Sequence, residues 1–164
     1  MNNSATTRRI SKIAVEYNGN DKGTAEMVYR NNLLSDDPEL QFKEMKAVAN
    51  RNKNVKNWGL TGYISPEKSI GDKLTNEELT DLALKTLWKV GVTDNNQIRL
   101  DIHSSTKQKH IHFIVNRVNT YGENTITAHK IGENFGKVVR EVCRELNLKT
   151  DIEIGKEKKQ IRKQ

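Results

Sequence analysis

Three histidines lie close together in the sequence, at positions 103, 110 and 112. Alternate side chains of a β-strand point to the same face, so His110 and His112 are expected side by side. If the polar residues 104–109 form a hairpin turn, His103 lies directly across from His110, with Cβ atoms about 5 Å apart. Three converging neutral imidazoles bind a divalent cation and leave positions open for water or a phosphate oxygen. The spacing therefore predicts a catalytic metal site formed by His103, His110 and His112.

The hairpin itself is predicted from the residues on either side of the turn. Residues 97–103 and 110–118 alternate apolar and polar side chains, which is the period of a half-buried strand. The apolar positions of both strands are expected to pack on helices: Ile98, Leu100, Ile102, Ile111, Phe113 and Val115. The fourth histidine, His129, precedes a predicted helix and is expected to be a helix cap or a surface residue.

Other segments predict further strands and helices around this hairpin. Thr75 and Glu78 form a capping-box pattern at the start of the clearest helix. Residues 39–56 are ambiguous between a helix and a polar loop, and residues 149–154 between a strand and a loop. The remaining predicted elements are strands at residues 10–17 and 57–64, a short helical stretch after Gly23 that contains Tyr29, and helices at residues 75–90 and 131–146.

Strands interleaved with helices, including one tight hairpin, predict an α+β fold. In this fold, helices flank a mostly antiparallel central sheet of roughly five strands. A length of 164 residues suits one domain, which we expect to span residues 1–154. Residues 155–164 are rich in Lys and Arg without aromatic residues, so they are expected to form a basic C-terminal tail that is disordered without a partner.

The composition favours a polyanionic partner. Lys and Arg total 28 against 21 Asp and Glu, which gives a formal net charge of +7 and favours nucleic acid. Cys143 is the only cysteine, so it forms no internal disulfide, and it is expected to be a small buried residue of a helix. The sequence begins without the apolar stretch of a secretory signal and has no run long enough to span a membrane. We expect a cytoplasmic protein without a membrane partner.

The pattern His103-x6-His110-x-His112, followed by Asn116-Arg117-Val118, resembles the three-histidine motif of plasmid mobilization relaxases. These MobA-type relaxases belong to the HUH endonuclease superfamily. The strand, Ser65-Pro66 break and helix that precede the motif are also similar to the order in that family. Residues 22–33 resemble its first motif, in which a helix near the N-terminus supplies a nucleophilic tyrosine. The resemblance spans about residues 10–148 and implies an HUH relaxase-like fold.

The resemblance implies a metal-dependent, site- and strand-specific DNA nickase. Such an enzyme cleaves and religates single-stranded DNA at a transfer origin through a covalent 5′-phosphotyrosine intermediate and thereby initiates conjugative mobilization. The implied nucleophile is Tyr29. Tyr17 is the main alternative, ahead of Tyr63 and Tyr121.

The resemblance also implies a cofactor and partners. It implies Mg²⁺ or Mn²⁺ in function, whereas three imidazoles also suit Zn²⁺, Ni²⁺ or Co²⁺ in a purified sample. The implied partners are single-stranded origin-of-transfer DNA, accessory mobilization proteins and a secretion coupling protein, in the cytoplasm of a bacterium.

Further residues are expected to act around the metal. Relaxases often carry acidic residues between the first two histidines, where this chain has Ser104, Ser105 and Thr106. Asp101 or Glu16 is therefore expected to support the metal ligands instead. Three polar residues near the motifs are expected to contact DNA: Arg30, Asn116 and Arg117.

Other classes of function stay open from the sequence. Another three-histidine hydrolase or nuclease would use metal-bound water and would not link a tyrosine to its substrate. In a replication-initiator HUH nuclease, the tyrosine usually follows the histidines rather than preceding them. A basic nucleic-acid-binding module would carry the histidines without any catalytic role.

Overall fold

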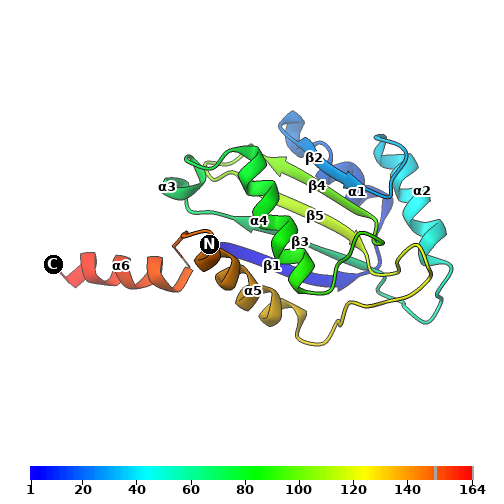
Figure 1. Cartoon of the computed structure of the whole chain (residues 1–164). Helices are drawn as coiled ribbons and strands as arrows, with labels where there is room; N and C mark the ends of the chain where they lie inside the picture. The colour runs from blue at the N-terminus through cyan, green and yellow to red at the C-terminus, as the bar shows by residue number, and fades with distance from the viewer. Residues whose placement is uncertain (150, 164) are drawn as a thin grey trace.

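The computed structural model describes residues 1–149 and 151–163. Its centre is a five-stranded sheet in the order β1-β3-β5-β4-β2, in which every neighbouring pair of strands is antiparallel (Figure 1). The strands are β1 (Asn2–Arg8), β2 (Glu26–Asn31), β3 (Gly59–Ser65), β4 (Ile98–His103) and β5 (His110–Asn116). The predicted α+β fold with a mostly antiparallel sheet of about five strands is confirmed.

Helices cover both faces of the sheet. α4 (Asn76–Lys89) and α5 (Ile131–Glu145) pack on one face, whereas α1 (Lys12–Asn18) and α2 (Pro38–Ala49) pack on the other (Figure 1). The ambiguous segment 39–56 thus divides into α2 and a polar loop. None of the described helices is long and apolar enough to cross a membrane. The other helical segments are the 3-10 turn η1 (Asp21–Gly23), α3 (Lys68–Gly71) and α6 (Asp151–Lys163).

β5 divides its side chains between the two faces. Ile111, Phe113 and Val115 are fully buried in the core that α4 and α5 cover, whereas Ile114 packs with residues of α1 and α2. His110 and His112 share the face of Ile114 because side chains alternate along a strand. The histidines therefore lie on the face of the sheet that carries α1.

Segments with strong local signals fold as predicted. The Thr75 side chain accepts a hydrogen bond from Glu78 N, and the Glu78 carboxylate accepts one from Thr75 N, which completes the capping box of α4. β3 ends directly before Pro66, which has no N–H to continue a ladder. α5 buries one apolar face, including Cys143, as predicted.

The first strand lies earlier in the chain than predicted. The prediction of a strand over residues 10–17 is wrong, because most of this segment forms α1, whose N-cap Ser11 accepts a hydrogen bond from Ala14 N. The first strand is β1, which pairs with β3. Its polar residues Asn2, Ser4 and Thr6 are exposed, so no apolar alternation marks this strand in the sequence.

The helical stretch predicted after Gly23 is also wrong. This segment forms β2 at the edge of the sheet, where it pairs with β4 and has a bulge between Met27 and Tyr29. Its hydrogen bonds come from a strand far along the chain. Such pairing outweighs the weak local pattern of this segment.

The C-terminal prediction is wrong as well. Asp151–Lys163 forms α6, rather than a strand or loop followed by a disordered tail. Lys, Glu and Gln in this segment are good helix formers. Two ion pairs at the surface accompany the helix, Lys149 with Glu157 at 2.6 Å and Lys158 with the partly buried Glu67 at 3.6 Å, although surface pairs contribute little stability. The domain boundary at residue 154 stays a prediction.

Candidate metal centre

The β4–β5 hairpin brings the three histidine rings together. His103 pairs with His110 across the hairpin, and His112 lies two residues farther along the same face. The ring centroids are 5.3 Å apart for His103 and His110, 4.0 Å for His103 and His112, and 4.8 Å for His110 and His112. One nitrogen of each ring lies within 4.8 Å of the other two. The predicted hairpin register and the predicted convergence of the rings are confirmed.

Backbone carbonyls fix the protonation of two of these rings. His103 Nε2 lies 2.8 Å from Asn18 O, and His110 Nδ1 lies 3.0 Å from Gln108 O. A carbonyl oxygen only accepts hydrogen bonds, so each of these nitrogens carries a proton and donates it. In the neutral form of each ring, the other nitrogen, Nδ1 of His103 or Nε2 of His110, keeps a free lone pair. Proteins orient histidine ligands of metal ions in this way.

His112 is also a neutral donor. Burial, together with the proximity of His103 and His110, lowers the pKa of His112 from 6.5 to about 3. At neutral pH the ring therefore offers a lone pair rather than a positive charge. Three neutral imidazoles form a donor set that fits a divalent transition metal.

The metal-free protein should become less stable as the pH falls below about 6.5. Between the ordinary pKa of 6.5 and the lowered value of about 3, the unfolded chain binds a proton at residue 112 that the folded chain does not bind, so acid favours unfolding. The Tm, measured in chelator from neutral pH down to about pH 5, should drop, and His112→Gln should reduce this drop. His129→Gln, at an exposed histidine, should preserve it. Equal pH slopes for the parent and His112→Gln would contradict the expectation.

A carboxylate from the N-terminal part of the chain faces the first histidine. Asp21 is 4% exposed, and its Oδ2 lies 3.7 Å from His103 Nδ1. Burial alone would raise the pKa of Asp21, but hydrogen bonds from Thr24 and Ser105 and the proximity of His103 lower it below the usual value, so Asp21 is ionised at neutral pH. A nitrogen lone pair and a buried carboxylate repel each other, so their close approach is stable only with a positive charge nearby. This arrangement favours a cation at His103 Nδ1.

The sequence prediction missed Asp21 and favoured Asp101 or Glu16. Asp101 does lie on the histidine face, opposite His112, but Arg99 donates to both of its oxygens at 2.8 and 2.9 Å. Glu16 is exposed and pairs with Lys12 at 3.8 Å. Asp21 meets the loop between the histidines through the hydroxyl of Ser105, 84 positions away, and no local pattern reveals such a contact.

Replacing Asp21 by Asn should weaken the binding of Mn²⁺ by roughly ten- to hundredfold, the usual effect of removing a carboxylate that supports metal ligands. The variant keeps the size of the side chain and removes its charge. Isothermal titration calorimetry with Mn²⁺ measures the effect, and Asp81→Asn, at an exposed position of α4, is the matched control. Equal affinities for the two variants would show that Asp21 does not act on a bound cation.

Tyr17 approaches the histidines from α1. Its ring centroid lies 6.5 Å from that of His103 at an interplanar angle of 77°, and the residue is 60% exposed, so it is open to a substrate. Val15 anchors the helix in the core. Gly19 follows the helix, and a Cβ there would lie 2.7 Å from Arg99 Nη2. Glycine therefore allows the end of α1 to approach the sheet closely.

Tyr29 lies on the opposite face of the sheet. It pairs with Leu100 and packs against the core that α4 and α5 cover. Burial raises the pKa of Tyr29, and the charge of Asp94 raises it further, which makes the phenolate harder to form. Because the sheet separates Tyr29 from the three imidazoles, the geometry does not support Tyr29 as the nucleophile and favours the alternative, Tyr17.

The residues predicted to contact DNA lie in different environments. Asn116 is buried, and its amide donates to a backbone oxygen and a side-chain oxygen at 2.9 Å each. Arg117 is also buried and donates to two backbone carbonyls. These bonds hold both side chains inside the fold, which argues against direct contact with DNA. Arg30 is exposed on the edge strand β2, and its contact with DNA stays a prediction. His129 is exposed, as expected of a surface residue.

Comparison with known proteins agrees with this geometry. A family model described as "Relaxase: MobA/VirD2-like, nuclease domain" matches residues 17–148. The match covers more than half of the chain and includes Tyr17 and the three histidines. No curated protein and no solved structure matches the chain.

Proposed function

Because the chain belongs to the MobA/VirD2-like family of relaxase nuclease domains, we propose that it is a metal-dependent nickase that acts on one DNA strand at an origin of transfer. The observation that carries this proposal is the position of the Tyr17 phenol on the same face as three converging imidazoles. A phenol is a weak nucleophile near neutral pH. A site that stabilises the charge of the reacting phosphate compensates for this weakness.

The side chains divide the work of the reaction. His103, His110 and His112 would hold a divalent cation, which would polarise the scissile phosphate and offset the charge of the transition state. Asp21 favours positive charge at His103. α1 holds the Tyr17 ring beside that of His103 and leaves it open to a DNA strand.

The proposed step is a transesterification. The Tyr17 oxygen forms a bond to phosphorus and loses its proton, and the bond from phosphorus to the 3′ oxygen breaks as that oxygen takes up a proton. The products are a 5′-phosphotyrosine and a free 3′-hydroxyl. One phosphodiester replaces another, so the reverse reaction religates the strand without an external energy source. This reversibility suits an enzyme that begins and ends plasmid mobilization.

The donor set bears on the identity of the metal. Mg²⁺ prefers oxygen ligands, whereas imidazoles favour Mn²⁺, Zn²⁺, Ni²⁺ or Co²⁺. We propose Mg²⁺ or Mn²⁺ in function and expect the other ions to bind purified protein. Accessory mobilization proteins and a secretion coupling protein are further proposed partners, which follow from the family rather than from any surface of the chain.

One experiment separates this function from its rivals. The protein is incubated with Mn²⁺ and a library of single-stranded oligonucleotides of random sequence that carry a label at the 3′ end, and the products are resolved on a denaturing gel. The nickase predicts labelled DNA that migrates with the protein. A metal-dependent hydrolase would cleave the DNA without this adduct, and a binding module would produce neither product.

A further inference from the structure

Part of the histidine face is open to solvent. α1 and α2 cover its β4 side and the region around Ile114, whereas the side that β1 and β3 form carries exposed polar residues. Side chains alternate along a strand, and Ser4 pairs with Tyr63, which pairs with His112. One row of side chains therefore runs from the β1 edge of the sheet to the metal centre. The β1 residues on this open face are Asn2, Ser4, Thr6 and Arg8.

Two hollows in this face meet at one aromatic ring. A hollow of about 350 Å³ is lined by Arg8, Tyr17, Tyr63 and His112, together with residues of β1 and β3. A second hollow of about 270 Å³ is also lined by Tyr63 and His112, together with His110. The nucleophile proposed above therefore faces the first hollow, and two of the metal ligands face the second. Tyr63 and His112 line both hollows.

The Tyr63 ring is available for stacking. Its centroid lies 5.7 Å from that of His112 at an interplanar angle of 38°, and the residue is 36% exposed. An exposed aromatic ring in a groove is the usual platform for a base of single-stranded DNA. A duplex hides its base faces in the stack, so this platform favours a single strand.

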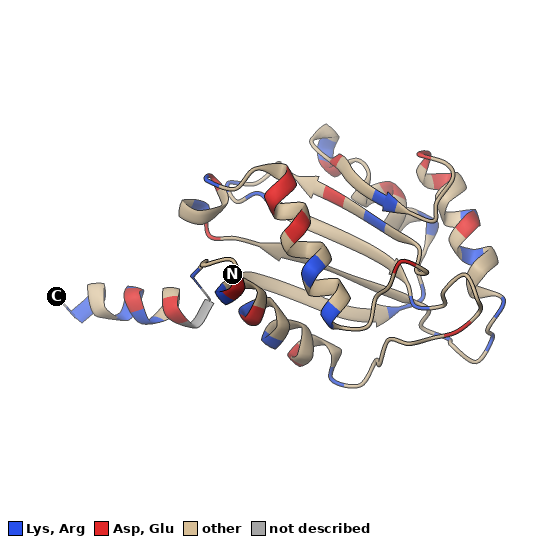
Figure 2. Ribbon diagram, viewed as in Figure 1, with Lys and Arg blue, Asp and Glu red and all other residues tan. Residues whose placement is uncertain are grey.

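The charge of the open face suits a phosphate backbone. The sequences of β1 and β3 contain no Asp or Glu, and Arg8 supplies a positive charge at the end of β1 (Figure 2). Arg8 lines the same hollow as Tyr17. A guanidinium there can pair with a phosphate next to the one that reacts.

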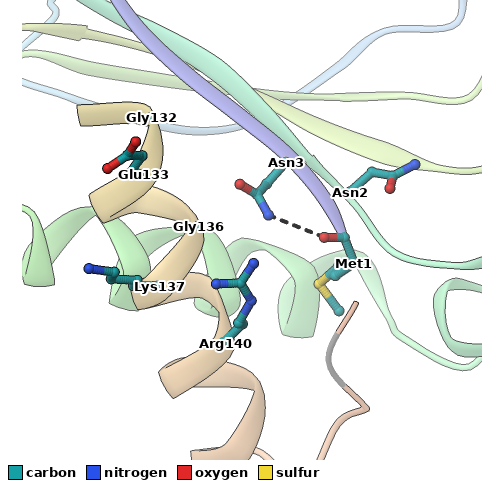
Figure 3. Close-up of a pocket in the computed structure, with 8 residues that line it drawn as sticks. All are labelled: Met1, Asn2, Asn3, Gly132, Glu133, Gly136, Lys137 and Arg140. Atoms are coloured by element: carbon teal, nitrogen blue, oxygen red, sulfur yellow. Dashed lines mark hydrogen bonds between the residues drawn. The ribbon is translucent and has the colours of Figure 1, made fainter. Parts of the chain in front are cut away.

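A different hollow, of about 430 Å³, lies between the start of β1 and α5 (Figure 3). Asn3 donates to Met1 O at one end of it, and Glu133, Lys137 and Arg140 line its helical wall (Figure 3). Because α5 covers the face opposite the histidines, this hollow is separate from the metal centre. The negative charge of the Glu133 carboxylate would repel a DNA phosphate there. It supplies a control residue, Lys137, which is exposed.

We propose that the two hollows hold the nucleotides on either side of the scissile phosphate, with one base stacked on Tyr63 and a neighbouring phosphate paired with Arg8. The inference rests on the proposed nickase function and names the surface that receives its DNA. It predicts that Tyr63 and Arg8 determine affinity for a single strand before any bond is broken.

Binding of fluorescein-labelled oligodeoxythymidylate, followed by anisotropy in EDTA, tests this surface without cleavage. Tyr63→Leu should weaken binding by roughly five- to hundredfold, and Tyr63→Phe, which keeps the ring, should bind like the parent. Arg8→Ala should lower the slope of log affinity against log salt by about 0.7. Tyr121→Leu, at another exposed tyrosine, and Lys137→Ala are the matched controls and should leave binding at the parental level.

The outcomes separate this inference from the function on which it rests. If the parent does not bind the probe, or if Tyr63→Leu and Arg8→Ala bind as their controls do, the proposed surface is wrong even when the parent forms an adduct with DNA and Mn²⁺. If the Tyr63 and Arg8 variants lose affinity as expected but the parent forms no adduct, the surface stands and the nickase function fails.

Discussion

Tyr17→Phe is expected to abolish the covalent protein–DNA adduct, with a loss of more than about a thousandfold in the rate of its formation. The substitution removes only the hydroxyl oxygen, so the ring keeps its place beside His103 and the fold is undisturbed. The oxygen is the atom that would bond to phosphorus. The rate is measured on denaturing gels with labelled single-stranded DNA and Mn²⁺.

Tyr29→Phe is the matched control for this substitution. It makes the same chemical change on the opposite face of the sheet, where the ring packs against the core, and adduct formation should stay at the parental level. If Tyr29→Phe abolished the adduct and Tyr17→Phe did not, the assignment of the nucleophile from the structure would be wrong. The first prediction from the sequence would then be right.

The second large effect is expected from the histidines. Replacing His110 or His112 by Ala should lower the affinity for Mn²⁺ by about a hundredfold or more, because a lost ligand costs more than the ten- to hundredfold typical of a supporting residue. Adduct formation should fall with it, as it should when EDTA removes the metal from the parent. Calorimetry measures the affinity, and the denaturing gel measures the adduct.

His129→Ala controls for the loss of an imidazole, since His129 is exposed and lies outside the trio. It should bind Mn²⁺ and form adduct as the parent does. Excess Mn²⁺ should restore part of the adduct in the His110 and His112 variants if their defect is weak binding. Undiminished adduct in EDTA would show that the chemistry does not depend on a metal.

The parts of the fold that could be predicted are those with local signals. Thr75 and Glu78 mark the start of α4 because a capping box needs only two residues three positions apart. The β4–β5 hairpin is equally local, since its turn has six residues. β1 could not be predicted, because Ser4 and Thr6 face solvent and the strand exists only through its pairing with β3.

In the candidate site, too, local signals could be predicted and contacts between distant segments could not. The three histidines belong to one hairpin, so spacing alone predicted their convergence. Tyr29 was favoured over Tyr17 because residues 22–33 resemble the first motif of the family, in which a helix supplies the tyrosine, whereas that segment is an edge strand and the helix lies earlier. Asp21 could not be found, because its contact with Ser105 depends on how α1 docks on the sheet.

The most direct test of the central claim, that Tyr17 reacts beside the three histidines, is to identify the tyrosine that carries DNA. Trypsin separates all four tyrosines into different peptides, since Lys or Arg stands between each pair. After nuclease digestion of the adduct, mass spectrometry should find the nucleotide on the peptide Ile13–Lys22, which contains Tyr17. A nucleotide on Gly23–Arg30, which contains Tyr29, or on either of the other two tyrosine peptides would contradict the account.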